Sequence, residues 1–165
     1  MENKKIEIPV EVYKYEELPE SDRRLVDAAR QATRRAYAPY SKFHVGAAIE
    51  MADGEIIIGA NQENAAFSSG TCAERSACFH AAVSHPDMAM KTIAIAAWTR
   101  LHHSDDASFD SCFQRRPISP CGACRQALLE YETLHGPIRV LLYGAEETYC
   151  LPSVASLLPF CFTEF

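Results

Sequence analysis

The chain has 165 residues, a formal charge of −6 at pH 7 and a hydrophobic fraction of 48%. This length suits one domain with its own core, and no apolar run approaches the roughly 20 residues of a membrane-spanning helix. An acidic chain lacks the clustered basic surface that polynucleotides require, so we expect a small-molecule partner and neither nucleic acid nor membrane.

The cysteine content and the amino terminus indicate the compartment. The chain has seven cysteines, an odd number, which argues against a complete disulfide framework. Its first residues alternate charges and lack the apolar segment of a signal peptide. We therefore expect a cytoplasmic protein whose thiols stay reduced.

The first third of the chain predicts an edge strand and then a helix. Residues 4–15 alternate apolar and polar side chains, and Pro9 among them confines such a strand to a sheet edge or divides it. We assign residues 1–17 to an extension that pairs with a sheet edge or another subunit, and 18–165 to one domain. Apolar residues at helical spacing predict a helix over 18–38.

The rest of the chain predicts a hairpin followed by alternating helices and strands. Asp53-Gly54 favours a tight turn between the first two strands. The expected elements are strands over 43–51 and 55–60, a helix over 72–84, a strand over 93–98, a loop over 100–119, a helix over 121–131, strands over 138–143 and 149–151, and a helical turn over 153–158. This order predicts an α/β fold with a mixed sheet.

Two short motifs predict a metal centre. They are Cys72-x-Glu74 and Cys121-x-x-Cys124. Two thiols three residues apart can hold one metal ion, and Cys72 can add a third ligand. Three protein ligands leave one position of Zn²⁺ open, which is the arrangement of a catalytic site, and Glu74 is placed to move protons beside it. We therefore predict one Zn²⁺ per chain.

Arg75 follows Glu74 in the first turn of the expected helix, where the helix macrodipole opposes a positive charge. Three thiolates around Zn²⁺ leave a net charge of about −1. Hydrogen bonds from Arg75 to the thiolates would offset that charge, so we predict a charge-balancing role.

The other thiols and imidazoles carry no such pattern. We interpret Cys78, Cys112, Cys150 and Cys161 as ordinary buried or partly buried thiols. His102-His103 is interpreted as loop surface rather than a second metal site.

Four segments resemble a known family over residues 20–162. They are YSKFHVGAA at 40–48, NQENA at 61–65, CAER at 72–75 and PCGACRQ at 120–126, with a weaker fifth, LLP at 157–159 followed by Phe162. Cys-x-Glu followed by Pro-Cys-x-x-Cys is the pattern of zinc nucleobase deaminases, in which the Glu is the general acid/base. The chain resembles the small, homotetrameric type of cytidine deaminase. The resemblance implies a three-layer α/β/α sandwich with a mixed five-stranded sheet.

The resemblance also implies roles for individual residues. Zinc would be held by Cys72, Cys121 and Cys124, with Glu74 catalytic. The implied substrate-binding residues are Phe43, Asn61, Glu63, Ala65, Phe67 and Phe162. Asn61 and Glu63 would hold the ribose hydroxyls, and Phe43 would pack on the base. Phe67 and Phe162 would come from neighbouring subunits of a homotetramer with shared active sites.

The sequence departs from the family pattern in three places. Phe67 stands where Tyr is usual, the loop over 100–119 is longer than expected, and the first twenty residues have no counterpart. Phe67 therefore lacks the hydroxyl that Tyr would offer for a polar contact.

The function implied is hydrolytic deamination of free cytidine and 2′-deoxycytidine to uridine and 2′-deoxyuridine, with release of ammonia, in pyrimidine salvage. The alternatives are deaminases of another nucleoside such as blasticidin S, of a nucleotide or of tRNA adenosine, and a non-catalytic zinc-stabilised interaction module. Glu74 argues against the module, and acidity argues against tRNA. The diol-binding pair Asn61 and Glu63 argues against blasticidin S, and the lack of a basic cluster opposes a nucleotide.

Overall fold

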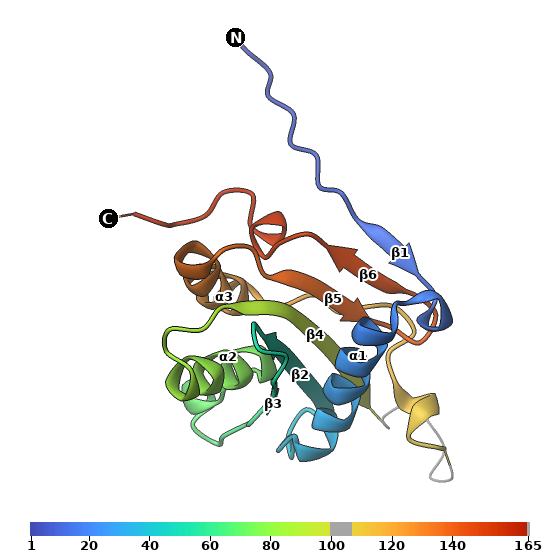
Figure 1. Cartoon of the computed structure of the whole chain (residues 1–165). Coiled ribbons are helices and arrows are strands. Elements are labelled where there is room, and N and C mark those ends of the chain that lie inside the picture. Colours follow the sequence, from blue (N-terminus) through green and yellow to red (C-terminus); the bar gives the residue numbers. More distant parts are fainter. Residues whose placement is uncertain (100–106, 165) are drawn as a thin grey trace.

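A mixed six-stranded sheet organises the chain in the computed structural model, which describes residues 1–99 and 107–164 (Figure 1). Across the sheet the strands are β1 (Glu11–Tyr13), β6 (Thr148–Leu151), β5 (Arg139–Tyr143), β4 (Met90–Thr99), β2 (Phe43–Met51) and β3 (Ile56–Ala60). Only β4 and β5 are parallel neighbours. The predicted α/β class and mixed sheet are confirmed. The strand count of five is wrong, because β1 adds a sixth strand beside β6.

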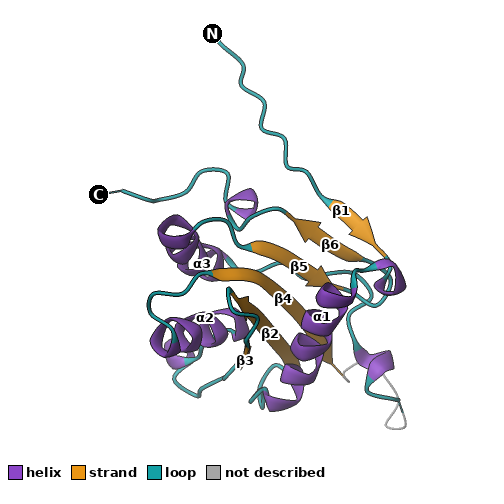
Figure 2. Cartoon of the chain, viewed as in Figure 1, coloured by secondary structure: helices purple, strands orange, loops and turns teal. Residues whose placement is uncertain are grey.

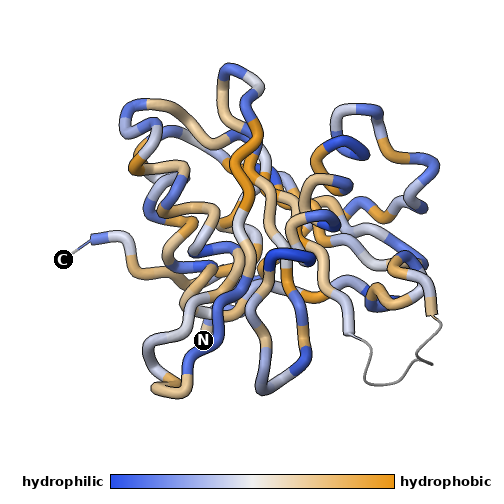
Figure 3. The backbone as a smooth tube through the Cα atoms, turned by 90° about the horizontal axis from the view of Figure 1, so that it is seen from below, coloured by the Kyte–Doolittle hydropathy of each residue, from blue (hydrophilic) through white to orange (hydrophobic). Residues whose placement is uncertain are grey.

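Helices cover both faces of this sheet. Helix α1 (Glu20–Ala32) lies on one face, and α2 (Ala73–Ser84) and α3 (Gly122–His135) lie together on the other (Figure 2). Successive strand residues point to opposite faces. Ala48 therefore packs in the cluster under α1, whereas its neighbour Ile49 packs in the cluster under α2 and α3. Figure 3 shows the hydrophobic residues concentrated along the central strands.

Helix α2 packs directly on β3, and this contact positions the start of the helix. A Cβ added to Gly59 of β3 would lie 2.3 Å from the backbone nitrogen of Ala77 and 2.5 Å from the carbonyl of Ala73. Beyond the strand, Gln62 and Thr71 exchange two backbone hydrogen bonds, each 2.9 Å long. The segment that follows β3 is thereby fixed beside the amino-terminal end of α2.

The predicted helix over 18–38 is too long at both ends. Helix α1 ends at Ala32 and is followed by a single 3₁₀ turn, Thr33–Arg35. Further on, the backbone of Tyr37 donates to the Asn61 carbonyl at 2.9 Å and accepts from Glu63 N–H at 2.8 Å. This pairing with a distant segment draws the chain out of the helix.

The predicted strand over 4–15 is also shorter than expected. Only Glu11–Tyr13 pair with β6, and residues 1–10 form neither helix nor strand. The other predicted strands and the helix over 72–84 are confirmed within two or three residues at each end. Helix α3 continues past the predicted 131 to His135, and the turn over 153–158 is the 3₁₀ turn Ala155–Leu157.

The predicted loop over 100–119 is described only from residue 107, so His102-His103 lies outside the described residues. The described part contains one 3₁₀ turn, Asp110–Cys112. Within the described ranges, no helix has the length and apolar character needed to cross a membrane.

Candidate functional site

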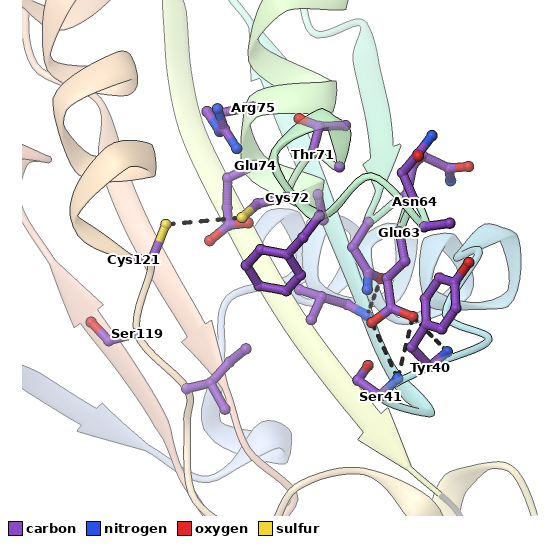
Figure 4. A pocket seen from close by; sticks show the side chains of 18 residues that line it. Tyr40, Ser41, Glu63, Asn64, Thr71, Cys72, Glu74, Arg75, Ser119 and Cys121 are labelled. Carbon is purple, nitrogen blue, oxygen red and sulfur yellow. Dashed lines mark hydrogen bonds between the residues drawn. The ribbon is translucent and has the colours of Figure 1, made fainter.

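Three cysteine thiols converge where the amino-terminal ends of α2 and α3 meet. Cys72 and Cys121 immediately precede the two helices, and Cys124 lies in the first turn of α3. The sulfur of Cys121 is 3.9 Å from that of Cys72 and 3.4 Å from that of Cys124 (Figure 4). All three sulfurs lie within 4.8 Å of one another. The structure therefore brings together all three predicted ligands.

The geometry and chemistry of this cluster fit zinc. Tetrahedral Zn²⁺ with Zn–S bonds of about 2.3 Å places its sulfurs about 3.8 Å apart. The observed separations of 3.9 and 3.4 Å lie close to that value. Among the described residues, this is the one cluster of three or more His, Cys, Asp or Glu side chains able to hold a metal ion.

The cluster also favours thiolate, which is the form that binds metal. Hydrogen bonds from Cys124, Cys121 and Arg75, with Cys124 contributing most, lower the pKa of Cys72 to about 5. The hydrogen bond with Cys72 raises the pKa of Cys124. The free N–H groups at two helix ends add positive potential around the sulfurs.

Glu74 lies beside these thiols and is almost completely buried. It is 4% exposed, and Figure 4 shows its carboxylate directed into the pocket near the Cys72 sulfur. Burial raises the pKa of this carboxyl, and the nearby Cys72 raises it further. A buried carboxyl of raised pKa suits a group that both accepts and donates a proton.

Arg75 projects from the same turn of α2. Its guanidinium interacts with the sulfurs of both Cys72 and Cys124. This interaction raises the pKa of Arg75 and helps to lower that of Cys72, and the charge-balancing role of Arg75 stays a prediction.

The cluster forms one end of a pocket of about 710 Å³. The pocket is lined by Tyr40, Ser41, Val45, Asn61, Gln62, Glu63, Asn64, Ala65, Phe67, Gly70, Thr71, Cys72, Ala73, Glu74, Arg75, Ile118, Ser119 and Cys121. Of the predicted site residues, Phe43 and Phe162 do not line it, and Cys124 is buried behind it.

Glu63 lies at the opposite end of the pocket from the thiols (Figure 4), and Asn61 lines the same pocket. The amide of Asn61 accepts from Val45 N–H at 2.8 Å and donates to the Phe43 carbonyl at 3.0 Å, so it fixes the start of β2. Glu63 accepts from the backbone N–H groups of Tyr40 at 2.9 Å and Ser41 at 3.3 Å. Hydrogen bonds from Ser41 and Tyr40 hold the pKa of Glu63 below its usual range, so it remains an ionised acceptor.

The aromatic residues assigned to the site lie near its edge or away from it. Phe67 lines the pocket but is 97% exposed. Phe162 is 63% exposed on the carboxy-terminal segment, where its carbonyl accepts from Gln126 at 2.8 Å. Phe43 is the first residue of β2 and is partly buried.

Sequence reasoning missed several lining residues. Tyr40 and Ser41 were within a recognised segment and could have been assigned from their proximity to Phe43. Ile118 and Ser119 belong to the long loop after β4 and lacked any pattern except their position before Cys121. Their place in the pocket depends on the path of that loop.

The sequence is similar to a known family model and to known proteins. Residues 19–135 match the family model described as "Cytidine and deoxycytidylate deaminase zinc-binding region". The chain is 38% identical over 141 residues to a cytidine deaminase of Sporosarcina psychrophila, covering 86% of this chain and 90% of that protein. It is 39% identical over 139 residues to a cytidine deaminase of Halalkalibacterium halodurans, covering 84% and 92%.

Solved structures are similar as well. The crystal structure of cytidine deaminase from Burkholderia pseudomallei superimposes with a TM-score of 0.66 at 36% identity, covering 84% of this chain and 97% of that chain. That from Mycobacterium tuberculosis gives 0.63 at 28% identity, covering 86% and 96%. The family-model match over residues 19–135, the identity with these cytidine deaminases and the shared fold show that the chain belongs to the cytidine and deoxycytidylate deaminase family.

Proposed function

We propose that this protein is a zinc-dependent hydrolytic deaminase of free cytidine and 2′-deoxycytidine, acting in pyrimidine salvage in the cytoplasm. Water replaces the exocyclic amino group at C4 of the base, which gives uridine or 2′-deoxyuridine and ammonia. The observation that carries the proposal is the buried carboxyl of Glu74 beside three converging thiols at one end of a pocket.

Cys72, Cys121 and Cys124 would hold one zinc ion per chain. When bound, zinc supplies a Lewis acid that makes water nucleophilic near neutral pH. Glu74 would accept one proton of the attacking water and deliver it to ring N3, then take the second proton from the hydroxyl now on C4 and pass it to the amino group, which leaves as ammonia. The burial of Glu74 keeps bulk water from competing for these transfers.

Asn61 and Glu63 would bind the ribose at the other end of the pocket. Glu63 has lone pairs left after accepting two backbone N–H groups, and a carboxylate can accept further O–H bonds from a sugar diol. Phe43 would pack on the base, and Ala65 would contact the substrate. These assignments follow the family pattern at the matching positions.

A homotetramer with shared sites would complete the pocket. Phe67 stands almost fully exposed at its edge, and Phe162 lies on an exposed terminal segment. A large apolar side chain exposed beside a binding site is typical of a surface that another chain covers. We therefore propose that neighbouring subunits contribute Phe67 and Phe162.

The direct test is ammonia release from a panel containing cytidine, 2′-deoxycytidine, cytosine, deoxycytidine monophosphate, adenosine and blasticidin S. We expect turnover of cytidine and 2′-deoxycytidine. Preference for the monophosphate or for blasticidin S would contradict the proposed substrate class, and no turnover of any compound by zinc-loaded protein would contradict the proposed activity.

Glu74→Gln is the matched variant, because it keeps the shape of the side chain and removes its proton transfer. We expect zinc content to remain and turnover to fall by about 10²- to 10⁴-fold or more. Near-normal turnover with full zinc content would exclude Glu74 as the proton-transfer residue.

A further inference from the structure

The amino-terminal segment, residues 1–10, extends away from the rest of the molecule (Figure 1). It nevertheless keeps the alternation of a strand and continues directly into β1. Its apolar side chains are exposed: Ile6 to 53%, Ile8 to 41% and Val10 to 44%. Three exposed β-branched residues on one face of a strand-like segment indicate a surface that pairs with something else.

The segment cannot continue its pairing within its own sheet. Glu11 lies opposite Cys150 and Val12 opposite Tyr149, so the same register places Pro9 opposite Pro152. Neither proline has a backbone N–H, and the ladder with β6 therefore stops at Glu11. β1 is also the last strand of the sheet, so among the described residues no strand pairs with its outer edge.

The apolar pattern of the segment is complementary to itself. Two copies can pair antiparallel with the centre of the pair at Ile8. Residue n of one copy then lies opposite residue 16 − n of the other. Ile8 then faces Ile8, and Ile6 faces Val10 in both directions. Residues 6, 8 and 10 alternate along the strand, so their side chains in both copies lie on one face of the two-stranded pair.

The charges agree with the same register. Lys5 lies opposite Glu11, and Glu2 opposite Lys14, each pair occurring twice in the dimer. A register centred on Glu7 would place that carboxylate opposite itself. One centred on Pro9 would place Glu7 opposite Glu11, which is again unfavourable. The side chains of Lys5 and Glu7 form an ion pair with each other and are 82% and 74% exposed, so the body of the protein does not use them.

We propose that the amino-terminal segments of two copies of this chain pair antiparallel about Ile8. In this arrangement residues 3–5 of each copy lie along the free outer edge of the other copy's β1, because they face residues 13–11. Edge strands offer unpaired backbone groups that an added strand can use. Pro9 withholds one donor from each segment, which an edge strand tolerates.

The register is tested by cross-linking. Ile8→Cys is introduced into a Cys161→Ser background, because Cys161 is an exposed thiol outside the thiol cluster. In the proposed pair the two introduced cysteines face each other within the roughly 4.4–6.8 Å between Cα atoms that a disulfide needs. We expect a covalent dimer on a non-reducing denaturing gel after mild oxidation.

Ile6→Cys in the same background is the matched control. The two copies of residue 6 lie four residues apart along the pair, or about 13 Å, too far for a disulfide. Random collision would cross-link the two variants equally. Equal cross-linking of both, or none with Ile8→Cys, overturns the proposal whatever the activity of the protein.

A charge swap provides an independent readout. In the Ile8→Cys background, Lys5→Glu or Glu11→Lys creates two like-charge pairs, and we expect each to reduce the yield of dimer by about threefold or more. The double variant Lys5→Glu/Glu11→Lys restores opposite charges and should recover the yield. Failure of the double variant to recover it would show that Lys5 does not face Glu11 and would overturn the register.

Discussion

Arg75 places a positive charge in the first turn of α2, where the helix macrodipole opposes it. Its contacts with the sulfurs of Cys72 and Cys124 offset this cost. A zinc ion with three thiolates has a net charge of about −1, and hydrogen bonds from a cation reduce the charge that the ligands present. We therefore propose that Arg75 balances the charge of the centre.

Arg75→Gln should leave the centre more negative, so that kcat falls and the pH–rate profile moves to higher pH. Cys72→His replaces a thiolate with a neutral ligand and should partly restore kcat when the two changes are combined. The measurement is kcat and zinc content of both single variants and the double variant. If the loss of kcat in the double variant equals the product of the losses in the two single variants, Arg75 does not act by balancing the charge.

Protonation of the His44 side chain is expected to lower the stability of the folded protein. Its ring stacks flat on Trp98, with centroids 4.4 Å apart and planes 6° apart. Burial lowers the pKa of His44, and Lys42 lowers it further, against an opposing effect of Glu63. The folded state therefore binds a proton less readily than the unfolded state, so stability is lost as the pH falls through about 6.5.

His44→Gln should remove part of this pH dependence. We measure the urea concentration at the midpoint of unfolding. As the pH is lowered from about 7.5 to about 5.5, we expect this midpoint to fall more in the wild type than in the variant. His80→Gln, at an exposed position on α2, is the control and should behave as the wild type. An unchanged pH slope in His44→Gln would exclude this role.

At the scale of elements, the loop after β4 is held by the segment that follows β5. Ala145 N–H donates to the Gln114 carbonyl at 2.8 Å, and Glu146 N–H donates to the Arg115 carbonyl at 3.0 Å. These hydrogen bonds hold the loop just before Ile118, Ser119 and Cys121 of the thiol cluster. Gly144 permits the approach, because an added Cβ would lie 2.6 Å from the Pro117 nitrogen.

Gly144→Ala should displace this loop, since every atom within 2.7 Å of the added Cβ belongs to the backbone. We expect a loss of about 1–3 kcal/mol in the free energy of unfolding and weaker zinc retention in competition with a chelator. Gly122→Ala is the control, because nothing lies within 4 Å of its added Cβ although it neighbours Cys121. Equal zinc retention in both variants would show that the loop adjusts without moving the ligand.

At the scale of the whole molecule, the thiol cluster joins two helices that come from separate parts of the chain. Cys72 precedes α2, and Cys121 and Cys124 belong to the start of α3. A metal bound only by the folded arrangement stabilises that arrangement by mass action. Zinc removal should therefore weaken the contact between these helices as well as activity.

Chelation should lower the melting temperature by about 5 °C or more, since a few kcal/mol corresponds to that shift in a chain of this size. The shift should persist in Glu74→Gln, whose ligands are intact, and disappear in Cys121→Ala. Equal melting temperatures with and without chelator, measured on protein shown to have contained zinc, would contradict this coupling.

The sequence by itself determined the features that depend on local spacing. Cys72-x-Glu74 and Cys121-x-x-Cys124 indicated a zinc deaminase, because a metal centre constrains the residue types and their separations, and together with the segments at 40–48 and 61–65 they carried the family resemblance. The alternation over 43–51 and the apolar run over 93–98 indicated β2 and β4, since strand periodicity is a property of neighbouring residues.

Only the tertiary structure decided the features that depend on distant partners. Tyr37 leaves the helical path because it pairs with the segment after β3. β1 begins only at Glu11, because continuing its register toward the amino terminus would place Pro9 opposite Pro152. Ile118 and Ser119 enter the pocket because the segment after β5 holds their loop. Backbone hydrogen bonds between segments far apart in the chain leave no local pattern, so no reading of neighbouring residues could have shown them.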